Sequence, residues 1–320
     1  MKRGQPVTQC TPTQVWRRHP DIPRFRNLIQ CDWKGTTSVE ILNIHGLCKR
    51  YPSFELKDVS FTMQSGTIMG FVGRNGAGKS TTLKSMLNFV HPDAGGIEFF
   101  GLDFRSHELE IKERISFTFG EVNFYPKKRI RDVTDVFRRF FRSWDETAYR
   151  CLLERFELVE TKKLDELSQG MRVKYAVALS LSHGAELILL DEPTSGLDPV
   201  SRDDLLDVFR DVVAEEGASI LFSTQIMTDL EKCADTITYI HKGRILASTT
   251  LGEFTSSYRA VSGESARTGD GVRGLLIGCR ERDGRLDALI HAENAPAAEA
   301  NGLQVGAADL ESIMIHLERK

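Results

Sequence analysis

The residues Gly73–Ser80, with the sequence GRNGAGKS, fit the phosphate-binding P-loop pattern at every fixed position. An apolar stretch, residues 67–72, precedes them and predicts a buried strand, and residues 79–89 predict a helix with one apolar side. A chance glycine-rich turn would lack both the Lys-Ser pair at this offset and the flanking elements. The pattern therefore predicts a strand, a glycine loop and a helix, which together place a phosphate site in an α/β fold.

Each part of this loop has a chemical task. Glycines let the backbone turn tightly and point its N–H groups at phosphate oxygens, and the helix N-terminus adds partial positive charge. Lys79 is expected to reach the β- and γ-phosphates, and the Ser80 hydroxyl is expected to ligate Mg²⁺. The residues expected to hold the nucleotide here are Gly73, Arg74, Asn75, Gly76, Ala77, Gly78, Lys79, Ser80 and Thr81.

A second apolar run, residues 187–190, ends in two carboxylates. Such a run is typical of a central strand that is covered on both faces. Ligands gather at the carboxyl ends of strands in open α/β sheets, so we expect Asp191 to hold Mg²⁺ and Glu192 to activate the attacking water. Pro193 would end the strand. The alternative, that the two carboxylates only cap the next helix, is weakened by the P-loop upstream.

The segment 167–171, Leu-Ser-Gln-Gly-Met, resembles the signature motif of ATP-binding cassette (ABC) ATPases. Residues 195–198 look like the D-loop of that family, and Tyr51 looks like its aromatic residue that stacks on adenine. The order of the motifs also matches, and the resemblance covers roughly residues 39–255. More narrowly, the chain is similar to the ATPase subunit of bacterial exporters from the antibiotic- and peptide-export branch, on the weaker likeness of residues 117–144 and of a short C-terminal domain.

The resemblance implies a RecA-like P-loop core of α/β class, with an antiparallel β edge and a helical signature subdomain. Ser168 is a good N-cap and Gly170 leaves the backbone bare, so the helix that follows begins with a free anion site. In the family this site meets the γ-phosphate held by a second cassette, so ATP would join two cassettes head to tail. A homodimer is the preferred arrangement over a heterodimer. The residues implied on this side of the nucleotide are Ser168, Gln169, Gly170 and Asp198.

Two departures from the family pattern bear on hydrolysis. Gln225 stands where the family usually has a histidine; its amide can donate a hydrogen bond to a γ-phosphate but cannot shuttle a proton. Gly120 stands where the family has a glutamine that touches Mg²⁺, and Glu121 or Asn123 would have to substitute. We therefore expect an ATPase of reduced rate with Glu192, Gln225 and Lys79 as catalytic residues and Ser80, Asp191 and Glu121 as metal ligands. A catalytically weak, ATP-gated binding subunit of a heterodimeric exporter stays open as the alternative.

Composition limits the remaining classes. The chain has 320 residues and a net charge of −3, which argues against nucleic acid as a partner. Its sequence contains no apolar run long enough to span a bilayer, so an exporter cassette of this kind needs a membrane-spanning permease. We expect a peripheral protein at the cytoplasmic face of the cell membrane. ABC ATPases of DNA maintenance would need long coiled coils, those of ribosomes usually have two cassettes, and the signature argues against a P-loop kinase.

Four parts are predicted along the chain. Residues 1–38 are expected to be a basic, disordered extension, and residues 39–255 the ABC ATPase domain. A Ser/Gly-rich linker is expected at 256–271, followed by a small α+β domain at 272–320. The expected elements of that domain are strands at 274–277 and 286–290, an Asp-Gly turn between them and an amphipathic helix at 308–319.

Aromatic and basic residues alternate between residues 123 and 144. We expect Phe124–Arg129 to form the rim on which the membrane-spanning subunit docks, because aromatic anchors with a basic border suit such contacts. The same segment also predicts a helix whose inner face packs in the core. The residues expected on that inner face are Val133, Val136, Phe137 and Phe140.

Overall fold

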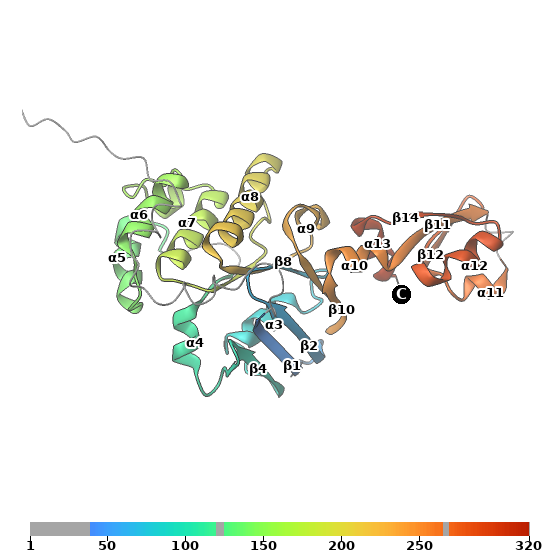
Figure 1. Cartoon of the computed structure of the whole chain (residues 1–320), viewed down its shortest axis with the longest axis horizontal. Coiled ribbons are helices and arrows are strands. Elements are labelled where there is room, and N and C mark those ends of the chain that lie inside the picture. Colours follow the sequence, from blue (N-terminus) through green and yellow to red (C-terminus); the bar gives the residue numbers. More distant parts are fainter. Residues whose placement is uncertain (1–38, 120–124, 265–268, 320) are drawn as a thin grey trace, which may run out of the picture. The chain divides into compact units, whose positions relative to one another are not determined.

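The computed structural model describes residues 39–119, 125–264 and 269–319 (Figure 1). Its strands are β1 Glu40–Arg50, β2 Glu55–Gln64, β3 Ile68–Val72, β4 Ala94–Phe99, β5 Leu102–Asp103, β6 Ile115–Phe119, β7 Leu187–Asp191, β8 Ser219–Thr224, β9 Thr236–His241, β10 Arg244–Thr250, β11 Tyr258–Glu264, β12 Ile277–Arg282, β13 Arg285–His291 and β14 Gln304–Ala307. Its α-helices are α3 Lys79–Met86, α4 Glu108–Arg114, α5 Ile130–Phe137, α6 Glu146–Arg155, α7 Gln169–Ser182, α8 Pro199–Glu216, α9 Met227–Cys233, α10 Leu251–Ser256, α11 Asp270–Arg273, α12 Ala295–Ala300 and α13 Leu310–Leu317. Short 3₁₀ turns lie at Arg138–Phe140, Leu164–Glu166 and Ala292–Asn294.

Three sheets organise these elements. Six strands hydrogen-bond in the order β10-β9-β3-β8-β7-β6, and two further sheets have the orders β2-β1-β4-β5 and β12-β13-β11-β14. Strands β3, β7 and β8 are buried along their whole length, and for β3 and β7 this confirms the prediction from their continuous apolar runs. The α/β class predicted from the sequence is therefore correct. None of the described helices has the length and apolar character that crossing a membrane requires.

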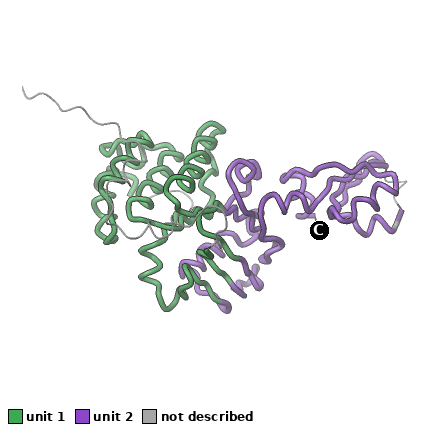
Figure 2. Tube along the Cα trace, viewed as in Figure 1, with its two compact units in different colours: residues 1–44, 62–68, 96–222 green, residues 45–61, 69–95, 223–320 purple. Residues whose placement is uncertain are grey.

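Two compact units collect segments that lie far apart in the sequence (Figure 2). Among the described residues, one unit contains 39–44, 62–68, 96–119 and 125–222, and so includes helices α4 to α8. The other contains residues 45–61, 69–95 and 223–320, and so includes the glycine loop and the C-terminal strands. The P-loop thus lies in one unit, and the other unit contains the signature motif and the Walker B motif, which is the apolar run 187–190 with the carboxylates Asp191 and Glu192.

Helices α5, α6 and α7 share a buried network of hydroxyl groups. The Thr134 hydroxyl lies 2.8 Å from both the Tyr149 and the Tyr175 hydroxyl, and Tyr175 also donates to the Ile130 carbonyl at 3.2 Å. All three hydroxyl-bearing side chains are buried. Because buried polar groups need partners, this network fixes the signature helix α7 against the two helices beside it.

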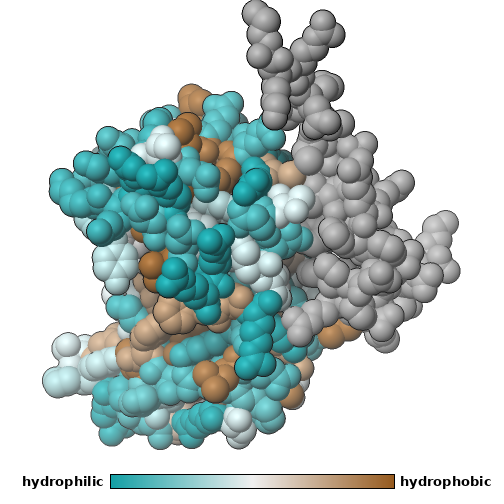
Figure 3. Space-filling view, turned by 90° about the vertical axis from the view of Figure 1, so that its left-hand side faces the viewer, coloured by the Kyte–Doolittle hydropathy of each residue, from teal (hydrophilic) through white to brown (hydrophobic). Residues whose placement is uncertain are grey.

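The prediction for the inner face of α5 is wrong in part. Val133 is buried as expected, but Val136 is 52% exposed and Phe140 is 74% exposed. The α-helix ends at Phe137 and the chain continues as a 3₁₀ turn, Arg138–Phe140, so the helical spacing that predicted the face does not extend to Phe140. Figure 3 shows the face on the side of α4, α5 and α6, where small apolar patches lie among hydrophilic groups.

An aromatic cluster surrounds His183 just after α7. The His183 ring stacks on Phe141 with centroids 3.9 Å apart and lies 5.9 Å from Phe137, while Trp144 packs on Phe137 at 6.3 Å. Burial lowers the pKa of His183 to about 4, below its ordinary value near 6.5. The imidazole is therefore neutral in the folded protein around pH 7.

This burial predicts acid-sensitive stability. Because the pKa of His183 is lower in the folded than in the unfolded chain, its contribution is fully present above about pH 6.5 and is lost as the pH falls towards 4. The free energy of unfolding is expected to drop by roughly 3 kcal/mol more in the wild type than in His183→Phe across that range. Urea titrations of both proteins between pH 7 and 4 test this, and parallel pH profiles would show that His183 contributes nothing.

The C-terminal sheet begins inside the segment that was predicted as a linker. Residues 256–271 contain strand β11, which pairs antiparallel with both β13 and β14. Val261 is buried in the core of this sheet, and a Cβ on Gly263 would lie 2.5 Å from Leu303. Gly263, one of the glycines that suggested flexibility, is therefore closely packed, and the linker prediction does not hold for residues 258–264.

The rest of the C-terminal domain follows the prediction with shifted bounds. The hairpin turn at Asp283 and Gly284 has positive φ at both residues, 52° and 76°, as two-residue turns of this kind require. The first strand of the hairpin starts later than predicted, at Ile277, and α13 forms the expected closing helix. One face of the sheet packs on α11 and α12 around a core made of Val261, Val272, Leu286, Ala288, Ile290, Ala298 and Leu303.

Candidate nucleotide-binding site

The glycine loop lies between β3 and α3, where the sequence predicts it. Lys79 is only 4% exposed, and its ammonium donates to the Gly73 carbonyl at 2.8 Å and the Arg74 carbonyl at 3.4 Å. Gly76 and Gly78 have φ of 80° and 118°, which L-residues rarely adopt. Apart from the adjoining residues, no atom that the structure describes lies within 4 Å of the place where a Cβ on Gly76 would stand, so the loop is open there. Within the described part of the chain, no side chain caps the N-terminus of α3, which leaves its first N–H groups available to an anion.

The closed side of the loop is filled by neighbouring side chains. A Cβ on Gly78 would lie 2.6 Å from Leu56 and 2.9 Å from Phe54. Tyr51 is linked to this segment, because its N–H donates to the Phe54 carbonyl at 2.7 Å. The Tyr51 ring is 39% exposed, with the Lys49 ammonium 5.8 Å from its centroid. The structure thus brings the predicted adenine-stacking residue into the segment that backs the loop, with its ring accessible to a ligand.

The Walker B carboxylates end the buried strand β7. Asp191 is its last residue, is 8% exposed, and pairs in register with Phe119 of β6. Glu192 follows with φ of 50°, a left-handed backbone that is uncommon outside glycine. Its carbonyl accepts a hydrogen bond from Ser195 N–H at 3.2 Å. Such conformations are costly and are retained where the surrounding structure fixes a side chain for a task.

The signature residues and the D-loop lie side by side. Ser168 is the N-cap of α7 and accepts from Met171 N–H at 3.2 Å, as predicted from its residue type. The Gln169 amide donates to the Ser195 carbonyl at 2.6 Å. Gly170 is buried, and a Cβ there would lie 3.7 Å from Leu197. A movement of one motif would therefore act directly on the other.

Asp198 was predicted to contact nucleotide, and in the structure it caps helix α8. Its carboxylate accepts from Val200 and Ser201 N–H, both at 3.0 Å, and from the Ser201 hydroxyl at 2.6 Å. These hydrogen bonds, the Ser201 hydroxyl first, hold the pKa of Asp198 below its usual range. The side chain thus has a local structural role that its residue type and the Pro199 after it were sufficient to suggest.

Of the two positions that depart from the family pattern, the structure describes Gln225 but not Gly120. Gln225 follows β8 directly and is exposed, and the turn there is fixed by the Thr224 hydroxyl, which accepts from Ile226 N–H at 2.9 Å. Gly120, Glu121 and Asn123 lie outside the described residues. The predicted docking residue Phe124 also lies outside them, while Tyr125 and the basic residues Lys127 to Arg129 are exposed.

Two supports of the site escaped prediction. One is the Gln169–Ser195 hydrogen bond described above. The other is the turn Lys242–Gly243, where Gly243 N–H donates to the Ala77 carbonyl of the loop at 2.9 Å and Gly243 O accepts from Lys57 N–H at 2.8 Å. The Lys-Gly pair between two strand-like segments signals a tight turn, but the sequence does not show what the turn contacts.

Comparisons with known proteins agree with this geometry. Residues 56–195 match the protein family described as "ABC transporter". The chain is 36% identical over 203 residues to the ABC transporter ATP-binding protein YtrB of Bacillus subtilis, covering 63% of this chain and 69% of that protein. It is 34% identical over 209 residues to the bacitracin transport ATP-binding protein BcrA of Bacillus licheniformis, covering 64% and 68%.

The fold is similar to a solved structure titled as the ATP-binding subunit of an ABC transporter. That similarity has a TM-score of 0.60 and 26% sequence identity, and it covers 67% of this chain and 91% of the other. The match at residues 56–195 includes the P-loop, the capped signature helix and the strand that ends in Asp191. The chain belongs to the family of ABC transporter ATP-binding subunits.

Proposed function

We propose that this chain is the ATP-binding and ATP-hydrolysing subunit of an ABC exporter and that it dimerises around ATP to drive a separate membrane-spanning subunit. The observation that carries the proposal is the open glycine loop with the buried Lys79 behind it. The similarity to BcrA, whose name refers to bacitracin transport, supports the antibiotic- and peptide-export branch. Within the chain, residues 39–255 form the ATPase domain of the proposal.

The proposed reaction is in-line attack of water on the γ-phosphate of ATP. Lys79 and the loop N–H groups bind the phosphates, and the Glu192 carboxylate takes the proton from the attacking water. Ser80 and Asp191 would hold Mg²⁺, with Glu121 as a further candidate, and the ion supplies positive charge to the phosphate oxygens when bound. Ser168 and Gly170 would meet the γ-phosphate of the nucleotide held by the second chain.

The proposed docking site for the membrane-spanning subunit is the exposed stretch from Tyr125 to Arg129. Tyr125 is 71% exposed, and Phe140, at the end of the same aromatic and basic segment of the sequence, is 74% exposed. Large apolar side chains on the surface, bordered by cations, suit an interface with another protein. Docking there would hold the chain at the cytoplasmic face of the membrane. Purification of the native complex, followed by mass spectrometry of the co-purifying membrane chain, tests this part and also identifies the transporter.

Gln225 favours a second candidate function, a weakly hydrolysing cassette in a heterodimer. The exposed amide at the end of β8 can donate one hydrogen bond but cannot carry a proton. If proton handling limits the rate, Gln225→His is expected to raise steady-state ATP turnover about tenfold, which is only ~1.4 kcal/mol of barrier. The affinity for ATP is expected to change little, because the amide already supplies a donor.

Measuring the steady-state ATP turnover of purified Gln225→His and of the wild type decides between the hydrolysing subunit and the weakly hydrolysing cassette. Gln225→Asn serves as the matched control, since it keeps the amide and changes only its reach. No gain in Gln225→His would place the limiting step elsewhere. Brisk turnover in the wild type would remove the case for a binding-only cassette.

A further inference from the structure

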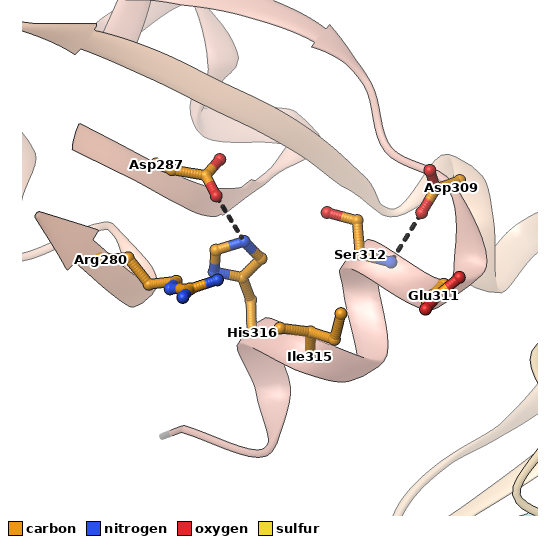
Figure 4. Close-up of a pocket in the computed structure, with 7 residues that line it drawn as sticks. All are labelled: Arg280, Asp287, Asp309, Glu311, Ser312, Ile315 and His316. Carbon is orange, nitrogen blue, oxygen red and sulfur yellow. Dashed lines mark hydrogen bonds and ion pairs between the residues drawn. The ribbon is translucent and has the colours of Figure 1, made fainter. Parts of the chain in front are cut away.

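The closing helix α13 is tied to the C-terminal sheet at one residue pair. Gly278 of β12 has φ of 59°, and a Cβ there would lie 2.0 Å from the His316 carbonyl, so only glycine allows the helix this close. The buried His316 ring has Nδ1 2.8 Å from the Gly278 carbonyl and Nε2 3.5 Å from an oxygen of Asp287. Figure 4 shows His316 between Arg280 and Asp287 on this side of the helix.

The end of the same helix is also tied to strand β9. Glu318, the residue after α13, accepts a hydrogen bond from the Tyr239 hydroxyl at 2.8 Å. Its other oxygen lies 3.2 Å from His241 Nδ1, and the side chains of His241 and Glu318 are only 13% and 14% exposed. One carboxylate thus joins the C-terminal domain to two positions at the end of β9.

Tyr239 stays protonated in this contact. Its side chain is fully buried, and burial, followed by the neighbouring Glu318, raises its pKa. The positive charge of Arg74, in the glycine loop, acts on the same phenol in the opposite direction. The phenol therefore lies within electrostatic reach of both the C-terminal carboxylate and the nucleotide loop.

The segment that Glu318 holds also supports the loop backbone. Tyr239 pairs in register with Val72, the last residue of β3 before the loop. A Cβ on Gly73 would lie 2.4 Å from the Ile240 carbonyl, so the strand and the loop are in close contact there. Two residues after His241, Gly243 donates to the Ala77 carbonyl at 2.9 Å. Tyr239, Ile240 and Gly243 thus form a path of short contacts from Glu318 to Ala77.

We propose that Glu318 is a positioning residue for nucleotide binding, through which the C-terminal domain holds the backbone of the glycine loop in its binding geometry. This inference rests on the proposed function of the loop. Without the carboxylate, the buried Tyr239 hydroxyl loses its acceptor and the end of β9 loses its tie to α13. The turn at Gly243 would then be free to move, and the Ala77 carbonyl would move with it.

The test compares four full-length proteins: wild type, Glu318→Ala, Glu318→Gln and the control Glu311→Ala, which changes an exposed carboxylate of the same helix. Calorimetric titration with Mg-ATP is expected to show about five- to tenfold weaker binding for Glu318→Ala, with KM raised and kcat nearly unchanged. Glu318→Gln keeps an oxygen that can accept from Tyr239 and is expected to recover part of the affinity. Hydrogen exchange of the amides of residues 76–79 and 239–243 is expected to be faster in Glu318→Ala.

Equal affinity and equal exchange in Glu318→Ala and Glu311→Ala would overturn the inference. If Glu318→Ala does not fold, Tyr239→Phe removes the same hydrogen bond while keeping the ring, and the same two measurements apply to it. A wild type that does not bind Mg-ATP would instead refute the proposed function. The exchange comparison needs no nucleotide, so it still decides whether Glu318 orders the loop.

Discussion

Lys79→Ala is expected to lose most of the affinity for ATP, by about 3 kcal/mol or roughly a hundredfold. The Lys79 ammonium is buried and held at the loop by the Gly73 and Arg74 carbonyls, so it is positioned before the nucleotide arrives. Hydrogen bonds between an ammonium group and phosphate oxygens are among the strong ones, and alanine supplies no substitute. Calorimetric titration with Mg-ATP measures the loss.

The matched control is Lys84→Ala, because Lys84 lies on the same helix α3 but is exposed and in its last turn. It removes an equal charge from the same element without touching the loop. Its affinity for ATP is expected to stay within a factor of about two of the wild type, since exposed charges outside the site contribute little. Equal affinities for Lys79→Ala and Lys84→Ala would refute the assignment of the P-loop.

The parts of the site that could be predicted from sequence are those that local chemistry determines. Positive φ at Gly76 and Gly78, the buried strand before them and the Ser168 N-cap all follow from residue types at fixed spacing. The Asp-Gly hairpin turn at residues 283–284 was predictable for the same reason. None of these features depends on a contact between distant segments.

The features that escaped prediction depend on such contacts. The segment around Gly263 has a composition typical of a linker, but the structure places Gly263 against Leu303. The pairing of β11 with β13 and β14 makes that segment a strand. Phe140 has the spacing of a core residue, and a change to 3₁₀ geometry exposes it. In each case tertiary structure overrode a local preference.

The hydrogen bond from Gln169 to the Ser195 carbonyl has a functional consequence. The family's commonest signature has glycine at this position, whereas here a side chain ties the signature to the D-loop 26 residues away. Gly196 has φ of 75°, and a Cβ there would lie 3.0 Å from the Gln169 oxygen, so the two segments fit closely. Only a few covalent and hydrogen bonds therefore connect the start of α7 with Glu192, directly after β7. A nucleotide bound at the start of α7 would affect the position of Glu192 through these bonds.

Glu192→Gln is expected to lower ATP turnover by about a hundredfold or more while leaving ATP binding intact. The amide is nearly isosteric with the carboxylate but cannot accept a proton from the attacking water. The left-handed backbone at Glu192 supports this role, because a costly conformation directly after a buried strand is retained where the surrounding structure fixes a side chain for a task. The closed, ATP-bound pair of chains would then persist, because hydrolysis no longer opens it.

Size-exclusion chromatography with Mg-ATP measures that pair directly. Glu192→Gln is expected to elute as a dimer, and adding Ser168→Arg is expected to return it to a monomer, because a large cation would occupy the start of α7 where the second chain's γ-phosphate is proposed to bind. Glu154→Gln, an exposed carboxylate on α6, and Thr161→Arg, an exposed position away from the signature, are the matched controls and are expected to leave the wild-type behaviour unchanged. A Glu192→Gln protein that binds ATP but stays monomeric at every ATP concentration would refute the homodimer and leave the heterodimer, because the nucleotide would then need an unlike partner's signature motif to close on.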